Sequence, residues 1–114
     1  MPRTAWTLVW SDEFSGPSGA RPDTANWRHE TGDGCTAGNC GWGNREQEYY
    51  TADRANASLT GTGALAITAR IAPAGLSCYD GPCRYTSAKL TTAGKVEPTY
   101  GRVEARIKLP HGQG

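Results

Sequence analysis

The sequence predicts an all-β fold, and three of its features support this prediction. Short segments alternate apolar and polar residues, most clearly at residues 102–109 and 65–71, and this alternation is the period of a half-buried strand. Fifteen glycines and seven prolines interrupt the chain at short intervals. No stretch has convincing helical periodicity. We therefore expect antiparallel strands in a sandwich or barrel, because alternating strands and helices would need helical segments between them.

Six segments are expected to form strands. In residues 102–109 the apolar positions are Val103, Ala105, Ile107 and Leu109, and charged residues occupy the positions between them. Residues 65–71 alternate in the same way after a glycine-containing turn. Aromatic and β-branched residues mark four weaker strands, at residues 6–10, 28–31, 46–51 and 85–92. No repeat or internal boundary divides the chain, so residues 1–114 belong to one domain at most.

Charge and hydropathy exclude two classes of partner. The net charge of +1 comes from 12 basic and 11 acidic residues that are scattered along the chain. Without a basic stripe, a nucleic-acid partner is not expected. No apolar run approaches the roughly 20 residues that a membrane-spanning helix requires, so membrane insertion is not expected either.

The four cysteines form two equally spaced pairs, Cys35 with Cys40 and Cys78 with Cys83. Four cysteines allow three disulfide connectivities, and local closure is the expected one, because four intervening residues can bring the two Cα atoms within bonding range. Structural zinc is the weaker alternative, since zinc sites favour tighter spacings and nearby histidines. Disulfides predict an extracellular protein, although the opening residues contain no apolar signal sequence. The sequon at residues 56–58 carries little weight.

Residues 41–44, Gly-Trp-Gly-Asn, combine a flat aromatic ring with a side-chain amide. Trp42 could stack on a sugar ring and Asn44 could hydrogen-bond its hydroxyls, although an aromatic loop anchor is the commoner role of such a tryptophan. Glu46 and Glu48 occupy alternate positions of an expected strand, which would place both carboxylates on one face about 6–7 Å apart. That distance is near the lower end of the range for inverting glycosidases, although solvated strand charges are more common.

Six stretches in order resemble the laminarinase-like branch of glycoside hydrolase family 16. They are WSDEF at 10–14, GWGNRE at 41–46, EYYT at 48–51, LAITAR at 65–70, YTSAKL at 85–90 and YGRVEARIKLP at 100–110. The resemblance covers essentially the whole chain. It implies an antiparallel β-sandwich of the jelly-roll, concanavalin A-like type, whose concave sheet forms an open cleft for a polysaccharide.

The resemblance also implies that the chain is the N-terminal portion of one such domain, truncated before the catalytic strand. Members of the family are retaining endo-hydrolases or transglycosylases, and two glutamates of an E-x-D-x-x-E or E-x-D-x-E strand carry the chemistry. This strand follows the block that here occupies residues 100–110, and neither motif occurs in the 114 residues. The chain is therefore expected to contain no catalytic residue and to be inactive alone, and Glu46 and Glu48 are set aside as catalysts.

Binding residues can be carried over from the family by position. Asn44 matches a position that resembles a substrate-contacting asparagine, and this supports a binding role for Trp42 as well. Many relatives have arginine where this chain has Lys89, so a two-point contact would become a single-point one. The resemblance also suggests a structural Ca²⁺ bound by the backbone carbonyls of Glu13 and Gly63 and by a later aspartate. The alternative is that Glu13 only forms a salt bridge.

Three functions remain open from the sequence. The first is an endo-acting β-1,3-glucanase, a laminarinase that needs no catalytic cofactor and is monomeric when complete. The second is a noncatalytic β-glucan-binding or lectin-like relative. The third, a small disulfide-stabilised interaction module, is disfavoured because half a sandwich leaves a sheet face uncovered. The sequence does not separate β-1,3-glucan from mixed-linkage glucan or β-galactan substrates, and laminarin-type glucan is the expectation from the family.

Overall fold

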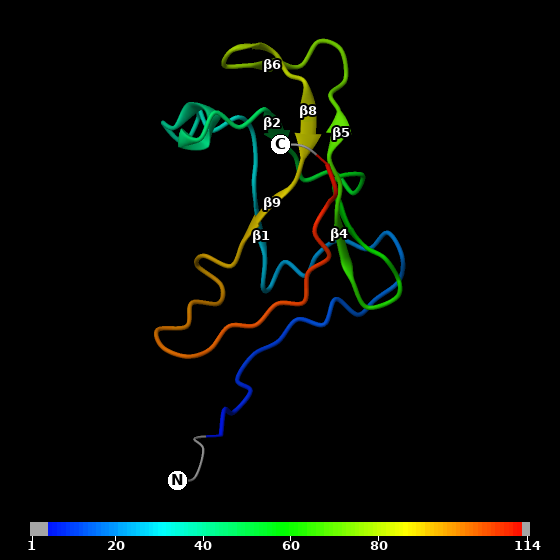
Figure 1. The fold of residues 1–114 in the computed structure, drawn as a ribbon, viewed down its shortest axis with the longest axis vertical. Coiled ribbons are helices and arrows are strands. Elements are labelled where there is room, and N and C mark those ends of the chain that lie inside the picture. The colour runs from blue at the N-terminus through cyan, green and yellow to red at the C-terminus, as the bar shows by residue number, and fades with distance from the viewer. Residues whose placement is uncertain (1–4, 113–114) are drawn as a thin grey trace.

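The structure is a computed structural model that describes residues 5–112, so the two ends of the expected 1–114 portion lie outside the described residues. Short strands and one 3₁₀ helix make up its regular structure, and no α-helix occurs within this range (Figure 1). The strands are β1 (Arg28–Glu30), β2 (Glu48–Tyr50), β3 (Ala57–Leu59), β4 (Leu65–Ile67), β5 (Arg70–Ile71), β6 (Ser77–Cys78), β7 (Gly81–Pro82), β8 (Tyr85–Ser87) and β9 (Lys89–Thr91). The 3₁₀ segment η1 spans Cys40–Gly43. The predicted all-β class is confirmed.

The strands form four small sheets, and most of their pairings are antiparallel. β1 pairs with β9, β3 with β4, β6 with β7 and β5 with β8, all antiparallel. The pairing of β2 with β8 is parallel, so this one pairing departs from the antiparallel arrangement that the sequence favours. Parallel neighbours need a connection of a dozen or more residues, and the chain between β2 and β8 contains five further strands.

Backbone contacts join two of these sheets at the place where the candidate site lies. Gly32, just after β1, exchanges both backbone hydrogen bonds with Tyr50 at the end of β2. β8 and β9 are separated only by the buried Ala88. The pair β1–β9 is therefore held beside the pair β2–β8, which brings residues from three separate segments of the sequence together.

The structure corrects several of the predicted strand boundaries. Residues 65–71 form two strands instead of one, since Thr68 and Ala69 leave the ladder between β4 and β5. Residues 85–92 are likewise divided at Ala88. Within the segment expected at 46–51, only Glu48–Tyr50 is a strand. Three strands, β3, β6 and β7, were not predicted, because their two or three residues are too short to display a period.

Two predicted strands are absent from the described structure, those at residues 6–10 and 102–109. Both segments run as irregular chain, with Val9 89% exposed and Val103 84% exposed. A strand requires a neighbour to which its backbone can hydrogen-bond, and neither segment has one within residues 5–112. The alternation at residues 102–109 indicates a side-chain face suited to burial. No strand or sheet covers that face within residues 5–112.

The core of the described chain is small. Its buried apolar residues are Ala57, Leu59 and Ala88. The radius of gyration is 16.7 Å, whereas a compact domain of this length would have about 13 Å. The described chain thus encloses only a small core, which argues against a self-contained interaction module.

Asn56 is the main polar anchor of this core and is only 2% exposed. Its side-chain nitrogen donates to the Thr68 carbonyl at 2.9 Å and to the Thr86 hydroxyl at 3.1 Å, and its oxygen accepts from Thr51. The network connects three segments through one side chain. A glycan would take one of the two N–H donors of this amide and would need space around a side chain that is 2% exposed, so the folded chain disfavours glycosylation at the 56–58 sequon.

Candidate carbohydrate-binding site

Both expected disulfides are present and each closes a small loop. Cys35 bonds to Cys40 with Cα atoms 4.0 Å apart, and Cys78 bonds to Cys83 with Cα atoms 4.9 Å apart. The described residues contain no free cysteine. The first loop leads directly into η1, which carries Trp42. Local closure, the connectivity that the spacing predicts, thus shapes the backbone beside the candidate site.

The loop holds Trp42 in an unusual backbone conformation. Its φ is +56°, in the left-handed region that non-glycine residues rarely adopt. Two hydrogen bonds keep it there: the Trp42 amide donates to the Asn39 carbonyl at 2.8 Å, and the indole Nε1 donates to the Gly32 carbonyl at 3.3 Å. Gly32 is the residue that bridges to Tyr50. The indole is thereby fixed against the end of β2.

Trp42, Tyr50, Lys89 and Glu46 form one cluster, here called the aromatic–lysine cluster. The rings of Trp42 and Tyr50 meet edge to face, with centroids 6.0 Å apart. The Lys89 ammonium lies 4.5 Å from the Trp42 ring centroid and 5.4 Å from that of Tyr50, which are both cation–π distances. Two of the three predicted binding residues, Trp42 and Lys89, therefore meet, although they are far apart in the sequence.

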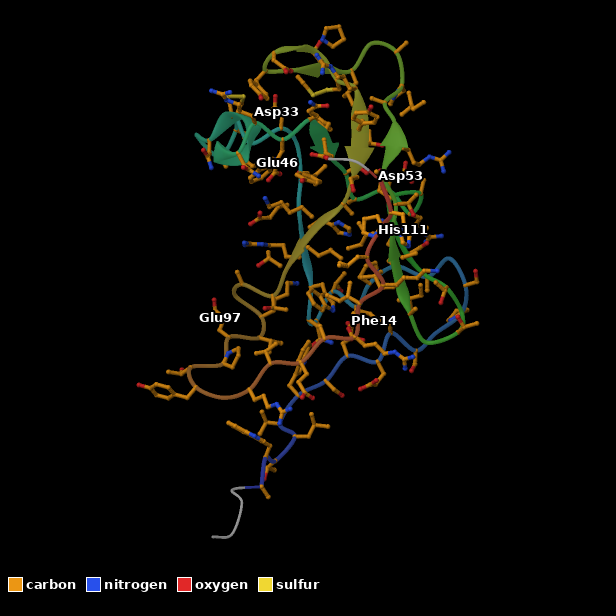
Figure 2. All side chains as sticks on the ribbon, in the orientation of Figure 1. Phe14, Asp33, Glu46, Asp53, Glu97 and His111 are labelled. Atoms are coloured by element: carbon orange, nitrogen blue, oxygen red, sulfur yellow. A yellow bond between two sulfur atoms is a disulfide. The ribbon has the colours of Figure 1, made fainter. Side chains whose placement is uncertain are left out.

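Glu46 completes the aromatic–lysine cluster from the loop side (Figure 2). Its Oε1 accepts a hydrogen bond of 2.6 Å from the Tyr50 hydroxyl and lies 3.8 Å from the Lys89 ammonium. Burial is the main cause that raises the pKa of Tyr50 above its ordinary value, and the hydrogen bond to Glu46 and the charges of Glu46 and Glu48 add to it. Tyr50 therefore remains a protonated donor at neutral pH.

The structure does not place Glu46 and Glu48 on one strand, as the alternation had suggested. β2 begins at Glu48, and Arg45 has a φ of +53° that turns the chain before Glu46. Glu46 accepts a hydrogen bond from Tyr50 and pairs with Lys89, whereas Glu48 lies half-buried within β2. The geometric premise of a Glu46–Glu48 pair was therefore wrong, and setting these residues aside as catalysts agrees with their positions.

Asn44 is the C-cap residue of η1. Its backbone amide donates to the Gly41 carbonyl at 3.1 Å, and the residue is exposed. Within residues 5–112 its side-chain amide makes no hydrogen bond. An exposed amide with free donors and a free acceptor, two residues from Trp42, is available to a ligand rich in hydroxyl groups.

Glu13 and Gly63, the two expected calcium ligands, are neighbours in the structure. A Cβ placed on Gly63 would lie 3.9 Å from the Glu13 carbonyl oxygen. Glu13 forms no ion pair within residues 5–112, so the salt-bridge alternative is not supported there. The same part of the chain contains no group of three acidic, histidine or cysteine side chains suited to a metal ion. Two backbone carbonyls fit the oxygen preference of Ca²⁺ but supply only part of its usual six to eight ligands.

Sequence reasoning missed Tyr50 and Tyr79 as parts of the site region. Tyr50 stands in an expected strand, and nothing in the strand pattern indicates which residues lie beside it from other segments. Tyr79 lies in the turn of the β6–β7 hairpin, and its side chain contacts Gly41, which is far away in the sequence. The described residues contain no helix long and apolar enough to cross a bilayer.

Known proteins similar to this chain include β-glucan hydrolases. The chain is 44% identical over 109 residues to a beta-glucanase of Rhodothermus marinus. The aligned residues are 96% of this chain and 33% of the relative. It is 37% identical over 94% of its length to a glucan endo-1,3-beta-glucosidase A1 of Niallia circulans, of which it covers 16%. Its relatives include laminarinases and endo-1,3-β-glucanases.

The solved structures of these laminarinases have the same fold. The catalytic domain of a Thermotoga maritima laminarinase superposes with a TM-score of 0.73 at 43% identity, over 86% of this chain and 36% of that one. The laminarinase of Rhodothermus marinus gives 0.66 at 44% identity, over 85% and 33%. The chain thus spans about a third of the laminarinase structures that it matches. No protein-family model matches the chain.

Not every similar protein is named as a β-glucan hydrolase. The clotting factor G alpha subunit of Tachypleus tridentatus is 41% identical over 109 residues, which are 96% of this chain and 14% of that protein. The resemblance to the laminarinase branch of family 16 and the jelly-roll fold class are both confirmed by the laminarinase structures.

Proposed function

We propose that residues 1–114 are the N-terminal part of one glycoside hydrolase domain and supply part of its glucan-binding cleft. The complete protein then hydrolyses internal bonds of β-1,3-glucan. The observation that carries this proposal is the aromatic–lysine cluster, because it gathers side chains chemically suited to sugar binding in a chain whose relatives include endo-1,3-β-glucanases.

The aromatic–lysine cluster is chemically suited to a neutral sugar. Trp42 offers an aromatic surface that can pack against the C–H face of a pyranose ring, and Asn44 lies at the same loop. Lys89 covers one face of the indole, so a sugar packs on the opposite face or edge. An ammonium has three N–H donors, which leaves Lys89 able to donate to a hydroxyl while it faces Glu46.

The chemistry of the complete enzyme would use two carboxyl groups about 5–5.5 Å apart, as retaining glycosidases do. One attacks the anomeric carbon, and the other protonates the leaving oxygen and then activates water. The chain has no E-x-D-x-x-E motif for this purpose, and Glu46 is held by Tyr50 and Lys89. The catalytic pair would therefore come from residues outside the 114.

The complete protein provides the test of this function. It should release oligosaccharides of several lengths from laminarin at early times, and NMR should find the β-anomer of the new reducing end first. Trp42→Ala and Asn44→Ala should each raise KM. Release of glucose alone, or first formation of the α-anomer, would contradict the proposal.

A noncatalytic glucan-binding protein is the alternative, and one observation favours it. The clotting factor G alpha subunit, 41% identical to this chain, is not named as a hydrolase. Laminarin that retards the complete protein in a native gel without being cleaved would support this alternative.

The proposed setting of the protein is extracellular, because two disulfides favour an oxidising compartment. We expect the complete protein to be a monomer that needs no catalytic cofactor. A structural Ca²⁺ would be held by the carbonyls of Glu13 and Gly63, whose neighbouring positions fit such a role, together with ligands from the remaining chain. Excess chelator should lower the melting temperature of the complete protein, and added Ca²⁺ should restore it; an unchanged temperature would count against the ion.

A further inference from the structure

The second disulfide closes a hairpin that lies beside the loop of Trp42 (Figure 1). β6 and β7 pair with Cys78 opposite Gly81, so that Tyr79 and Asp80 form the turn. The Cys78–Cys83 bond and a hydrogen bond from the Cys83 amide to the Leu76 carbonyl close its base. A two-residue turn above a disulfide leaves the Tyr79 backbone few alternatives.

The side chain of Tyr79 rests on Gly41, the residue immediately before Trp42. A Cβ on Gly41 would lie 2.9 Å from the Tyr79 hydroxyl oxygen and 3.0–3.2 Å from two carbons of its ring. The phenol therefore fills the space that a side chain at position 41 would need. Gly41 is buried, whereas Tyr79 remains 41% exposed.

Gly41 is also the backbone junction of the Trp42 loop. Its amide donates to the Asp33 carbonyl at 2.7 Å, and its carbonyl accepts from the amides of Asn44 and Glu46 at 3.1 and 3.0 Å. A displacement of Gly41 would therefore move Trp42, Asn44 and Glu46 together. Among these three are two of the proposed sugar contacts and the partner of Lys89.

We infer that Tyr79 is a positioning residue, which holds the Trp42 loop in its glucan-binding conformation by covering Gly41. The inference rests on the proposed function. The hairpin stabilises the order of the loop before the sugar arrives, and pre-ordering a binding side chain lowers the entropy cost of binding. Removing the phenol should consequently weaken glucan binding without altering the chemical step.

The test compares three variants of the complete protein, Tyr79→Ala, Tyr79→Phe and Asp80→Asn. Tyr79→Ala should raise KM for laminarin about fivefold, the cost of ordering one side chain, while kcat and the melting temperature stay near those of the wild type. Tyr79→Phe keeps the ring over Gly41 and should restore KM. Asp80→Asn, an exposed neighbour in the same turn, is the matched control and should leave KM unchanged. An unchanged KM in Tyr79→Ala would overturn the inference. A fall in kcat and melting temperature instead of a rise in KM would overturn it as well.

A readout that needs no catalysis separates this inference from the proposed function. Acrylamide quenching of tryptophan fluorescence should increase in Tyr79→Ala, and the increase should vanish when Trp42→Phe is present in both proteins. If the wild type neither cleaves nor binds laminarin, the proposed function fails, but quenching still decides whether Tyr79 positions Trp42. Equal quenching in the wild type and Tyr79→Ala would refute the positioning role.

Discussion

Substitution of Gly41 by alanine tests how closely the two disulfide loops are packed. Gly41 has a φ of +65°, and a left-handed conformation costs a residue with a Cβ about 1–2 kcal/mol. The new methyl group would lie 2.9 Å from the Tyr79 oxygen. Because this oxygen is the free end of a side chain that is 41% exposed, the phenol can move aside, and the overpacking costs about 1 kcal/mol, the low end for such contacts. Gly41→Ala should therefore lower the free energy of unfolding by roughly 2–3 kcal/mol.

Gly38 in the first disulfide loop provides the matched control for this substitution. It has a similar φ of +75°, but nothing lies within 4 Å of the position that its Cβ would occupy. Gly38→Ala should therefore incur only the conformational cost of about 1–2 kcal/mol. The difference between the two variants in urea unfolding of the complete protein measures the contact with Tyr79.

A double variant isolates that contact further. Adding Tyr79→Ala removes the phenol, so the steric part of the Gly41→Ala cost should disappear, and the two substitutions should be non-additive by at least about 1 kcal/mol. Equal costs at positions 38 and 41, together with additive effects of Gly41→Ala and Tyr79→Ala, would refute the packing described here.

Three further predictions concern the core, the sheet and the aromatic–lysine cluster. Asn56→Ala leaves buried partners unsatisfied and should destabilise the complete protein by about 1–3 kcal/mol in urea unfolding; a smaller loss than that of an exposed-site control such as Asp80→Ala would contradict this. Burial, with a contribution from the charge of Arg21, lowers the pKa of His29 below its usual 6.5. The folded protein therefore favours neutral His29, and the contribution of this residue to folding stability is complete above about pH 6.5 and is lost as the pH falls through the lower folded pKa. The stability of His29→Gln should depend less on pH between 8 and 5, and an identical pH profile would argue against this. Lys89→Met removes the cation above Trp42 and should weaken laminarin binding about fivefold in fluorescence titration, whereas Lys89→Arg should bind at least as tightly as the wild type.

The sequence was informative where local patterns and covalent geometry determine the outcome. The alternation at Leu65–Ile67 and the β-branched and aromatic residues of Tyr85–Ser87 both form strands. The short spacing of each cysteine pair likewise agrees with its local disulfide. In these cases the relevant interactions involve neighbours in the chain or the simple distinction between an apolar and a polar face.

Features that depend on a distant partner could not be predicted. The segment at residues 102–109 has the clearest strand period in the chain, yet no neighbouring strand pairs with it within the described residues. The parallel pairing of β2 with β8 depends on the path of the intervening strands, which the pattern of either strand does not specify.

The candidate site follows the same rule. Trp42 and Lys89 could be singled out individually, but their contact arises because β8 and β9 meet at Ala88 beside the end of β2. The hydrogen bond from Tyr50 to Glu46 depends on the turn at Arg45, whose positive φ is not apparent from its residue type. The role of Tyr79 depends on a glycine far away in the sequence.

Release of reducing ends from laminarin tests the central claim most directly, when it is measured in parallel for the complete protein and for residues 1–114 alone. The claim is that the chain contains glucan-binding residues and that the catalytic carboxylates lie elsewhere. The complete protein should release reducing ends, and residues 1–114 should release none above the buffer control at the same molar concentration. Hydrolysis by residues 1–114 that is abolished by Glu48→Gln would contradict the claim and return Glu48 to the catalytic centre.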